Sequence, residues 1–166
     1  MKKRIILICV ILGGILVDQI SKILTFSLMS VGESIELIPG ALNLTYIQNE
    51  GAAFGMLSNH RWIFMIISAV AIIGIGIYLF GFCKERMMLK VGLAMIVSGG
   101  LGNMVDRTVY GYVVDMIDFC LFDFWKWIFN VADAFVCVGA GVVVLSLLLD
   151  IIKDTKEKKK KNENNR

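Results

Sequence analysis

Four long apolar runs dominate this chain of 166 residues, and they limit the folds open to it. Hydrophobic residues make up 57% of the sequence and charged residues only 19%, which is too little charge to cover a soluble domain of this size. Each run is close to the roughly 20 residues that cross a hydrocarbon core of about 30 Å as a helix. We therefore expect an all-α membrane protein, a four-helix transmembrane bundle in one integral membrane domain, with spans at residues 5–28, 62–82, 87–105 and 131–152.

Lysine and arginine are divided unevenly between the two sides that such spans define. The amino terminus, the connection between the second and third runs, and the tail at 153–166 hold thirteen of the seventeen, and the rest of the chain holds four. Cytoplasmic segments of membrane proteins are enriched in these residues. We therefore predict that both termini face the cytoplasm. The basic tail is expected to contact anionic membrane lipids and not nucleic acid, which is the alternative for such a charge run.

The two segments left on the outer side differ in pattern. Polar and apolar side chains largely alternate along residues 34–38 and 42–47, and Pro39-Gly40 between these segments predicts a turn. We therefore expect two strands in a small extracytoplasmic β-cradle over about 33–57. Residues 106–130 instead hold eight of the seventeen aromatic side chains. Aromatic residues gather at the boundary between membrane and water, so we predict an interfacial aromatic segment there.

Polar side chains beside the apolar runs are the most informative residues, because an ionised group costs about 3 kcal/mol at the bilayer centre on insertion scales. Asp18 and Lys22 are four residues apart and share a helix face. The pair either neutralises itself near the helix end or points into a site between helices. Asn103 and Arg107 share a face in the same way, beside Gly99, and glycines favour close helix packing. Arg107 can extend to the interface, but this does not explain the buried Asn103.

Two acids, Asp115 and Asp133, flank the start of the fourth run. Asp133 has a structural explanation, since Asn130 can cap the helix and an acid three residues later complements the helix dipole. Asp115 stands among apolar residues and has no such explanation. Because the third span runs outward and the fourth inward, both acids lie at similar depth. Paired carboxylates in a low-dielectric site share a proton, which is the equipment of an aspartic peptidase. A proton-coupled transporter subunit and a structural scaffold are the alternatives.

The polar residues also form five short motifs in a fixed order. These are D-x-x-S-K at Asp18 to Lys22, N-x-G-A-A-F-G at Asn49 to Gly55, G-N-x-x-D-R at Gly102 to Arg107, V-V-D at Val113 to Asp115, and F-N-x-A-D at Phe129 to Asp133. Together they resemble the lipoprotein signal peptidase family, the type II signal peptidases of bacteria. The resemblance covers nearly the whole chain.

The resemblance implies a membrane aspartic endopeptidase that cleaves prolipoproteins before a cysteine carrying a diacylglyceryl group, and that lipopeptides such as globomycin inhibit. It assigns catalysis to Asp115 and Asp133. The supporting or substrate-binding residues that it implies are Asp18, Lys22, Asn49, Gly51, Gly99, Asn103, Arg107, Asn130 and Ala132. We expect no cofactor and no metal, because the chain has one histidine and four scattered cysteines without a CxxC pair.

Overall fold

A computed structural model of the chain describes residues 2–51, 61–83, 86–121 and 127–164. Its helices are α1 (Lys2–Leu28), α2 (Arg61–Ile77), which continues as the π-helix η1 (Tyr78–Phe82), α3 (Met87–Val109) and α4 (Val131–Asn164). Within these ranges four helices are long and apolar enough to cross a membrane. The predicted architecture of four membrane helices is confirmed, and the chain is a multi-pass membrane protein.

Two helices extend beyond the carboxyl-terminal ends that hydropathy predicts, and α1 begins at Lys2 instead of residue 5. Helix α3 ends at Val109 instead of residue 105, because Asp106 and Arg107 find partners inside the protein and do not have to leave the helix to reach water. Helix α4 continues from residue 152 to Asn164, is exposed at residues 152–159 and 161–163, and has a Lys153–Glu157 pair at the i, i+4 spacing. Hydropathy marks where the apolar side chains end, which is not where the helix ends.

Helix α3 is the centre of the bundle. It packs against α1, α2 and α4, and most extensively against α4. A core cluster of Leu7, Ile11, Leu79, Ala94 and Val97 joins α1 and α3 to η1. Much of the remaining apolar surface points outward, as on α2, where Ile66, Ile67 and Val70 are each at least 60% exposed. This distribution fits helices surrounded by lipid.

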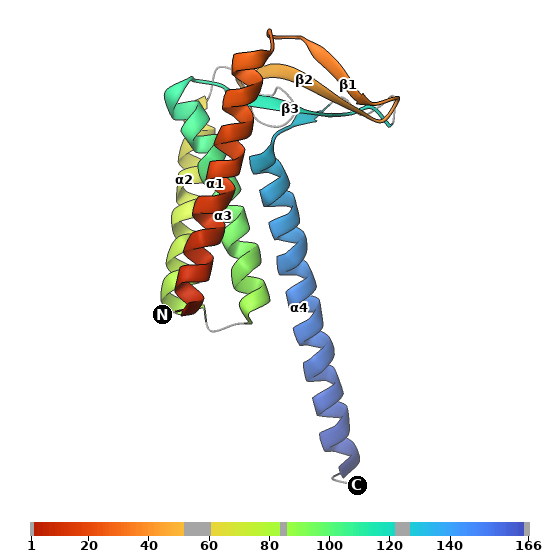
Figure 1. The fold of residues 1–166 in the computed structure, drawn as a ribbon. Coiled ribbons are helices and arrows are strands. Elements are labelled where there is room, and N and C mark those ends of the chain that lie inside the picture. Colours follow the sequence, from red (N-terminus) through yellow and green to blue (C-terminus); the bar gives the residue numbers. More distant parts are fainter. Residues whose placement is uncertain (1, 52–60, 84–85, 122–126, 165–166) are drawn as a thin grey trace.

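A four-stranded antiparallel sheet covers one end of the bundle, opposite the end at which both termini lie (Figure 1). Its strands, in the order β1-β2-β3-β4, are β1 (Ser34–Ile38), β2 (Leu42–Asn49), β3 (Val113–Phe119) and β4 (Ile128–Phe129). The first two match the predicted strands, and β2 runs two residues further. Residues 52–57 of the predicted cradle lie outside the described residues.

The predicted aromatic segment at 106–130 is organised differently from the expectation. Its first residues complete α3, and β3 and β4 join the same sheet as the cradle. Backbone pairing with β2, which aromatic content does not reveal, decides this arrangement. Residues 122–126 of the segment lie outside the described residues.

Strand register brings two of the predicted site residues together. Ile47 lies opposite Asp115 and Asn49 opposite Val113, after an irregularity in the β2–β3 ladder between Leu44 and Ile47. Val114 and Met116 belong to a buried cluster with Met29 and Tyr46, which joins the sheet to the end of α1. Because successive side chains alternate along a strand, Asp115 points to the other face, away from this cluster.

Candidate active site

Small residues let α3 and α4 approach closely beneath the site. A Cβ atom added to Gly92 would lie 2.8 Å from the carbonyl oxygen of Gly139, and one added to Gly139 would lie 2.7 Å from the oxygen of Gly92. At Gly99 an added Cβ would overlap the carbonyl oxygen of Ala132. Packing of this kind is typical of membrane helices, where small residues allow backbones to touch. It places polar side chains of α3 beside the first turn of α4.

A buried charge cluster joins α1 to α3. The ammonium nitrogen of Lys22 lies 2.9 Å from Asp18 Oδ2 and 3.0 Å from Asp106 Oδ2, and it donates a hydrogen bond of 3.0 Å to Asn103 Oδ1. Lys22 is 3% exposed and both carboxylates are at most 1% exposed. Of the two interpretations of the Asp18–Lys22 pair, the structure therefore supports the one in which it points into a site between helices.

Asp18 and Gln19 extend this cluster to the amino terminus of α4 and along α3. Asp18 Oδ1 accepts a 2.8 Å hydrogen bond from the amide of Ala132, one of the first helix amides, which have no partner within the helix. A carboxylate is favourable there because the helix dipole is positive at this end. The side-chain nitrogen Nε2 of Gln19 donates to the carboxylates of Asp18 and Asp106 and to the carbonyl oxygen of Gly102.

Asn130 and Asp133 cap α4 reciprocally. The backbone N–H of Asp133 donates to Asn130 Oδ1 at 2.9 Å, and the backbone N–H of Asn130 donates to Asp133 Oδ2 at 3.2 Å. This is the predicted cap, and it leaves Asp133 Oδ1 to accept a 2.7 Å hydrogen bond from Asn103 Nδ2. Asp133 is thus held both by its own helix and by α3.

Asp115 is enclosed by two asparagines. Its side chain is 1% exposed, Asn49 Nδ2 donates to Oδ2 at 2.9 Å, and Asn130 Nδ2 donates to Oδ1. Burial raises the pKa of Asp115 to about 6, the negative charge of Asp133 adds to the rise, and the two asparagine hydrogen bonds oppose it. Because Asn130 bonds both carboxylates, it fixes them relative to one another.

Arg107 and Gly51 close the same end of the site. Arg107 Nη2 donates to the carbonyl oxygen of Gly51 at 3.3 Å, and Nη1 donates to that of Asn103 at 3.4 Å. The amide of Gly51 in turn donates to Asn49 Oδ1 at 3.0 Å, which orients the Asn49 side chain. Every site residue predicted from the sequence therefore belongs to this network or to the helix contact beneath it.

The sequence prediction did not include Gln19 and Asp106, although both are part of the network. Each stands next to a predicted residue, Gln19 beside Asp18 and Asp106 beside Arg107. Asp106 also lies three residues after Asn103, so it shares that residue's helix face. This spacing could have identified Asp106 as a further residue of the site. In the described part of the chain, no group of three or more His, Cys, Asp or Glu side chains is arranged to hold a metal ion.

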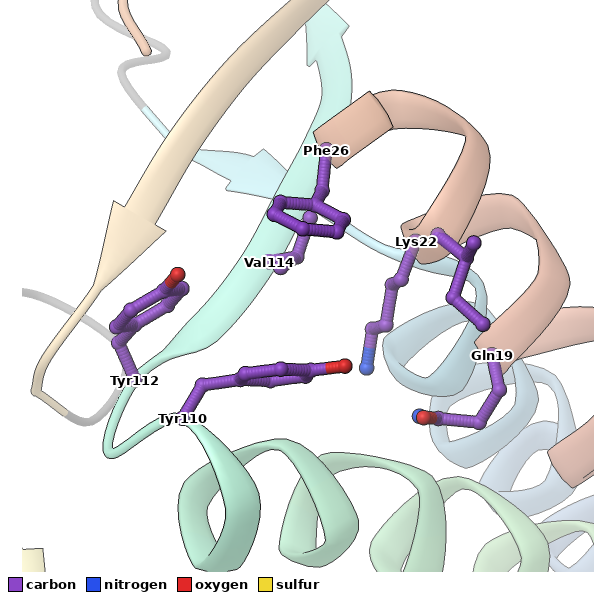
Figure 2. A pocket seen from close by; sticks show the side chains of 7 residues that line it. Gln19, Lys22, Phe26, Tyr110, Tyr112 and Val114 are labelled. Carbon is purple, nitrogen blue, oxygen red and sulfur yellow. The ribbon is translucent and has the colours of Figure 1, made fainter. Parts of the chain in front are cut away.

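A small cleft lies behind the network, where the end of α1 meets the corner between α3 and β3 (Figure 2). It is lined by Gln19, Lys22, Ile23, Phe26, Tyr110, Tyr112 and Val114. The rings of Tyr110 and Tyr112 stack with centroids 6.0 Å apart. The three N–H groups of Lys22 already have acceptors in Asp18, Asp106 and Asn103, so this part of the cleft wall belongs to the network.

Asn130 joins two carboxylates at one end of a bundle of four membrane helices, and two neighbouring carboxylates are the feature expected of an aspartic peptidase. The comparisons with known proteins agree with this class. The family model described as "Signal peptidase (SPase) II" matches residues 10–149. The chain therefore belongs to the signal peptidase II family and is an aspartic peptidase, which decides against the transporter and scaffold alternatives.

Individual relatives support this assignment over most of the chain. The lipoprotein signal peptidase of Halalkalibacterium halodurans is 42% identical over 144 residues, which cover 87% of this chain and 92% of the relative. That of Clostridioides difficile is 39% identical over 143 residues, covering 86% and 93%. A solved structure of a bacterial membrane enzyme superposes with a TM-score of 0.81 at 32% identity, covering 87% of this chain and 88% of the other.

Proposed function

We propose that this enzyme removes signal peptides from prolipoproteins by cleaving the bond before a diacylglyceryl-modified cysteine, with Asp115 and Asp133 as the catalytic pair. The observation that carries the proposal is the position of Asn130, which bonds both carboxylates and thereby holds them at one place in the fold. The names of the relatives supply the substrate class.

The chemistry follows from one proton shared by two carboxylates. With its pKa raised to about 6, Asp115 keeps a proton at mildly acidic pH, and in that form it can polarise the scissile carbonyl while Asp133 takes a proton from the attacking water. Attack forms the C–O bond and gives a tetrahedral intermediate. Its breakdown breaks the C–N bond as the nitrogen receives a proton. Asn103 and Asn49 keep each carboxylate oriented through both steps.

The depth of the pair suits a lipid-anchored substrate. Asn103, which bonds Asp133, lies six residues before the end of α3, or about 9 Å along the helix axis. A diacylglyceryl group would hold the substrate cysteine at the membrane, near this end of the bundle. Anchoring there confines the scissile bond beside the carboxylates, so the lipid contributes mainly through orientation.

The proposal predicts lipid-dependent cleavage. The purified enzyme in detergent or lipid should cut a diacylglyceryl-modified prolipoprotein, and the unmodified precursor should react at least about 100-fold more slowly, because it lacks this positioning. Gel analysis of the released signal peptide measures both rates. Globomycin, a lipopeptide mimic of the substrate, should inhibit. Equal rates for the two precursors would refute lipid-dependent recognition, and cleavage of neither would refute the proposed function.

We further propose that the sheet and the site face the outer side of the cytoplasmic membrane and that both termini face the cytoplasm. The uneven distribution of lysine and arginine supports this orientation, as does the position of both termini at the end opposite the sheet (Figure 1). In a background without the native cysteines, an impermeant maleimide should label Leu37→Cys in intact cells and Thr155→Cys only after permeabilisation. Labelling of Thr155→Cys in intact cells would reverse the orientation.

A further inference from the structure

Helix α3 holds two polar side chains, one bonded to α4, which carries Asp133, and the other bonded to β3, which carries Asp115. Asn103 donates to Asp133 on α4 at 2.7 Å. Asp106, on the same face, accepts a 3.2 Å hydrogen bond through Oδ2 from the amide of Val114, the residue before Asp115 on β3. One helix face is therefore bonded to α4 at one point and to β3 at another.

Lys22 links these two side chains and fixes the orientation of one of them. Its ammonium group donates to Asn103 Oδ1 and pairs with Asp106 Oδ2. Asn103 Oδ1 also accepts from Asn130 Nδ2 at 3.1 Å, so the oxygen is committed to two donors and the Nδ2 group is left to donate to Asp133. A flipped Asn103 would place its nitrogen against the Lys22 ammonium.

Asp106 has no exposed surface, and both of its oxygens have partners. Oδ1 accepts from Gln19 at 2.8 Å, and Oδ2 serves Lys22 and the amide of Val114. A fully buried carboxylate is costly unless it is paired and hydrogen-bonded, and this one meets both conditions. Its partners lie on α1 and β3, and neither of the two proposed catalytic carboxylates is among them.

We propose that Asp106 is a positioning residue that bonds β3 to α3 and holds Lys22 against Asn103, so that α3 sets where Asp115 and Asp133 lie relative to each other. The inference rests on the proposed catalytic pair. It assigns to Asp106 an effect on turnover through Val114 and Lys22, without contact with the substrate.

The test compares Asp106→Asn and Asp106→Glu with the parent enzyme on a diacylglyceryl-modified peptide. Asp106→Asn should lower kcat about 100-fold and leave KM within about twofold, because displacing a reacting group by about 1 Å costs this much without removing substrate contacts. Asp106→Glu keeps the charge that Lys22 requires but moves the carboxylate by one methylene. It should remain folded and lose about tenfold in kcat.

The pH profile separates positioning from general destabilisation. In the parent, kcat should fall as pH rises through the raised pKa of Asp115, about 6, because the pair then loses its shared proton. Loosening β3 weakens the hydrogen bonds from Asn49 and Asn130 that oppose this rise. The pKa of Asp115 therefore goes up, and in both variants the falling limb should move to higher pH.

Asp150→Asn is the matched control. It removes the Arg86–Asp150 ion pair that joins the start of α3 to α4 at the opposite end of the bundle, and it should leave kcat and the pH profile unchanged. The proposal is overturned if the folded Asp106 variants keep the parental kcat and falling limb, or if Asp106→Glu fails to fold. If the parent itself cleaves no modified peptide, the proposed function fails instead.

Discussion

Replacing either proposed catalytic aspartate by asparagine is expected to abolish turnover. Asp115→Asn and Asp133→Asn should each lower kcat by about 10⁴-fold or more, since neither variant retains two carboxylates that can share a proton and activate water. Groups that act as a unit are not additive, so the double variant should be little slower than either single one. Initial rates on a modified prolipoprotein, measured at equal concentrations of folded enzyme, test this.

The surroundings of Asp115 show why folding must be monitored in this experiment. Both of its oxygens accept from side-chain amides, and the oxygens of those two amides accept backbone hydrogen bonds, so neither amide can turn to suit a new donor. Asp115→Asn therefore places the NH₂ group of the new side chain against the NH₂ group of Asn49 or of Asn130. Asp118→Asn, on the same strand but bonded to Thr45, is the control and should remain active. A folded Asp115→Asn or Asp133→Asn enzyme with substantial activity would disprove the assignment.

The four helices could be predicted because lipid contact leaves a mark on local sequence. Residues that face lipid are apolar whatever their tertiary partners are, so runs of about 20 such residues identify spans. The hairpin of β1 and β2 is similarly local, since Pro39-Gly40 marks its turn. The order of the five motifs along the chain identified the family and named the residues that meet in the network.

The tertiary partners of these residues could not be predicted in the same way. Lys22 and Asn103 are separated by 81 positions, and their contact depends on how closely α1 and α3 pack. Asp106 looked like the end of a span because a charged residue normally stops a hydrophobic run, whereas its partners on α1 and β3 allow it to remain inside. Strand β3 was missed because it pairs with β2, far away in the sequence.

Lys22→Met should cause the largest loss of stability among single substitutions in the network. Methionine keeps most of the length of the side chain, including its contribution to the wall of the cleft in Figure 2, and removes the charge. It leaves Asp18 and Asp106 buried without their cation. Breaking a buried ion pair on one side costs about 3–5 kcal/mol, which corresponds to a Tm lower by about 10 °C in a protein of this size.

Lys153 offers a control with the same spacing and chemistry in a different environment. It pairs with Glu157 at i, i+4 and 3.7 Å, as Lys22 does with Asp18 at 2.9 Å. The two side chains of the Lys153 pair are 61% and 67% exposed, whereas those of the Lys22 pair are 3% and 1% exposed. An exposed pair contributes about 0–1 kcal/mol, so Lys153→Met should shift Tm by no more than about 3 °C. Thermal melts of both variants in one detergent make the comparison direct.

The same argument predicts a partial rescue. The loss of Tm in Lys22→Met is expected to come from two unpaired carboxylates in an apolar setting. Adding Asp18→Asn and Asp106→Asn removes these charges and should therefore recover part of the Tm. The kcat should stay low, because Asn103 is no longer oriented by Lys22. A Lys22→Met protein that melts like the parent would show that water reaches these groups. A triple variant less stable than Lys22→Met would show that the loss of the hydrogen bonds made by Asp18 and Asp106, and not their buried charge, accounts for most of the fall in Tm.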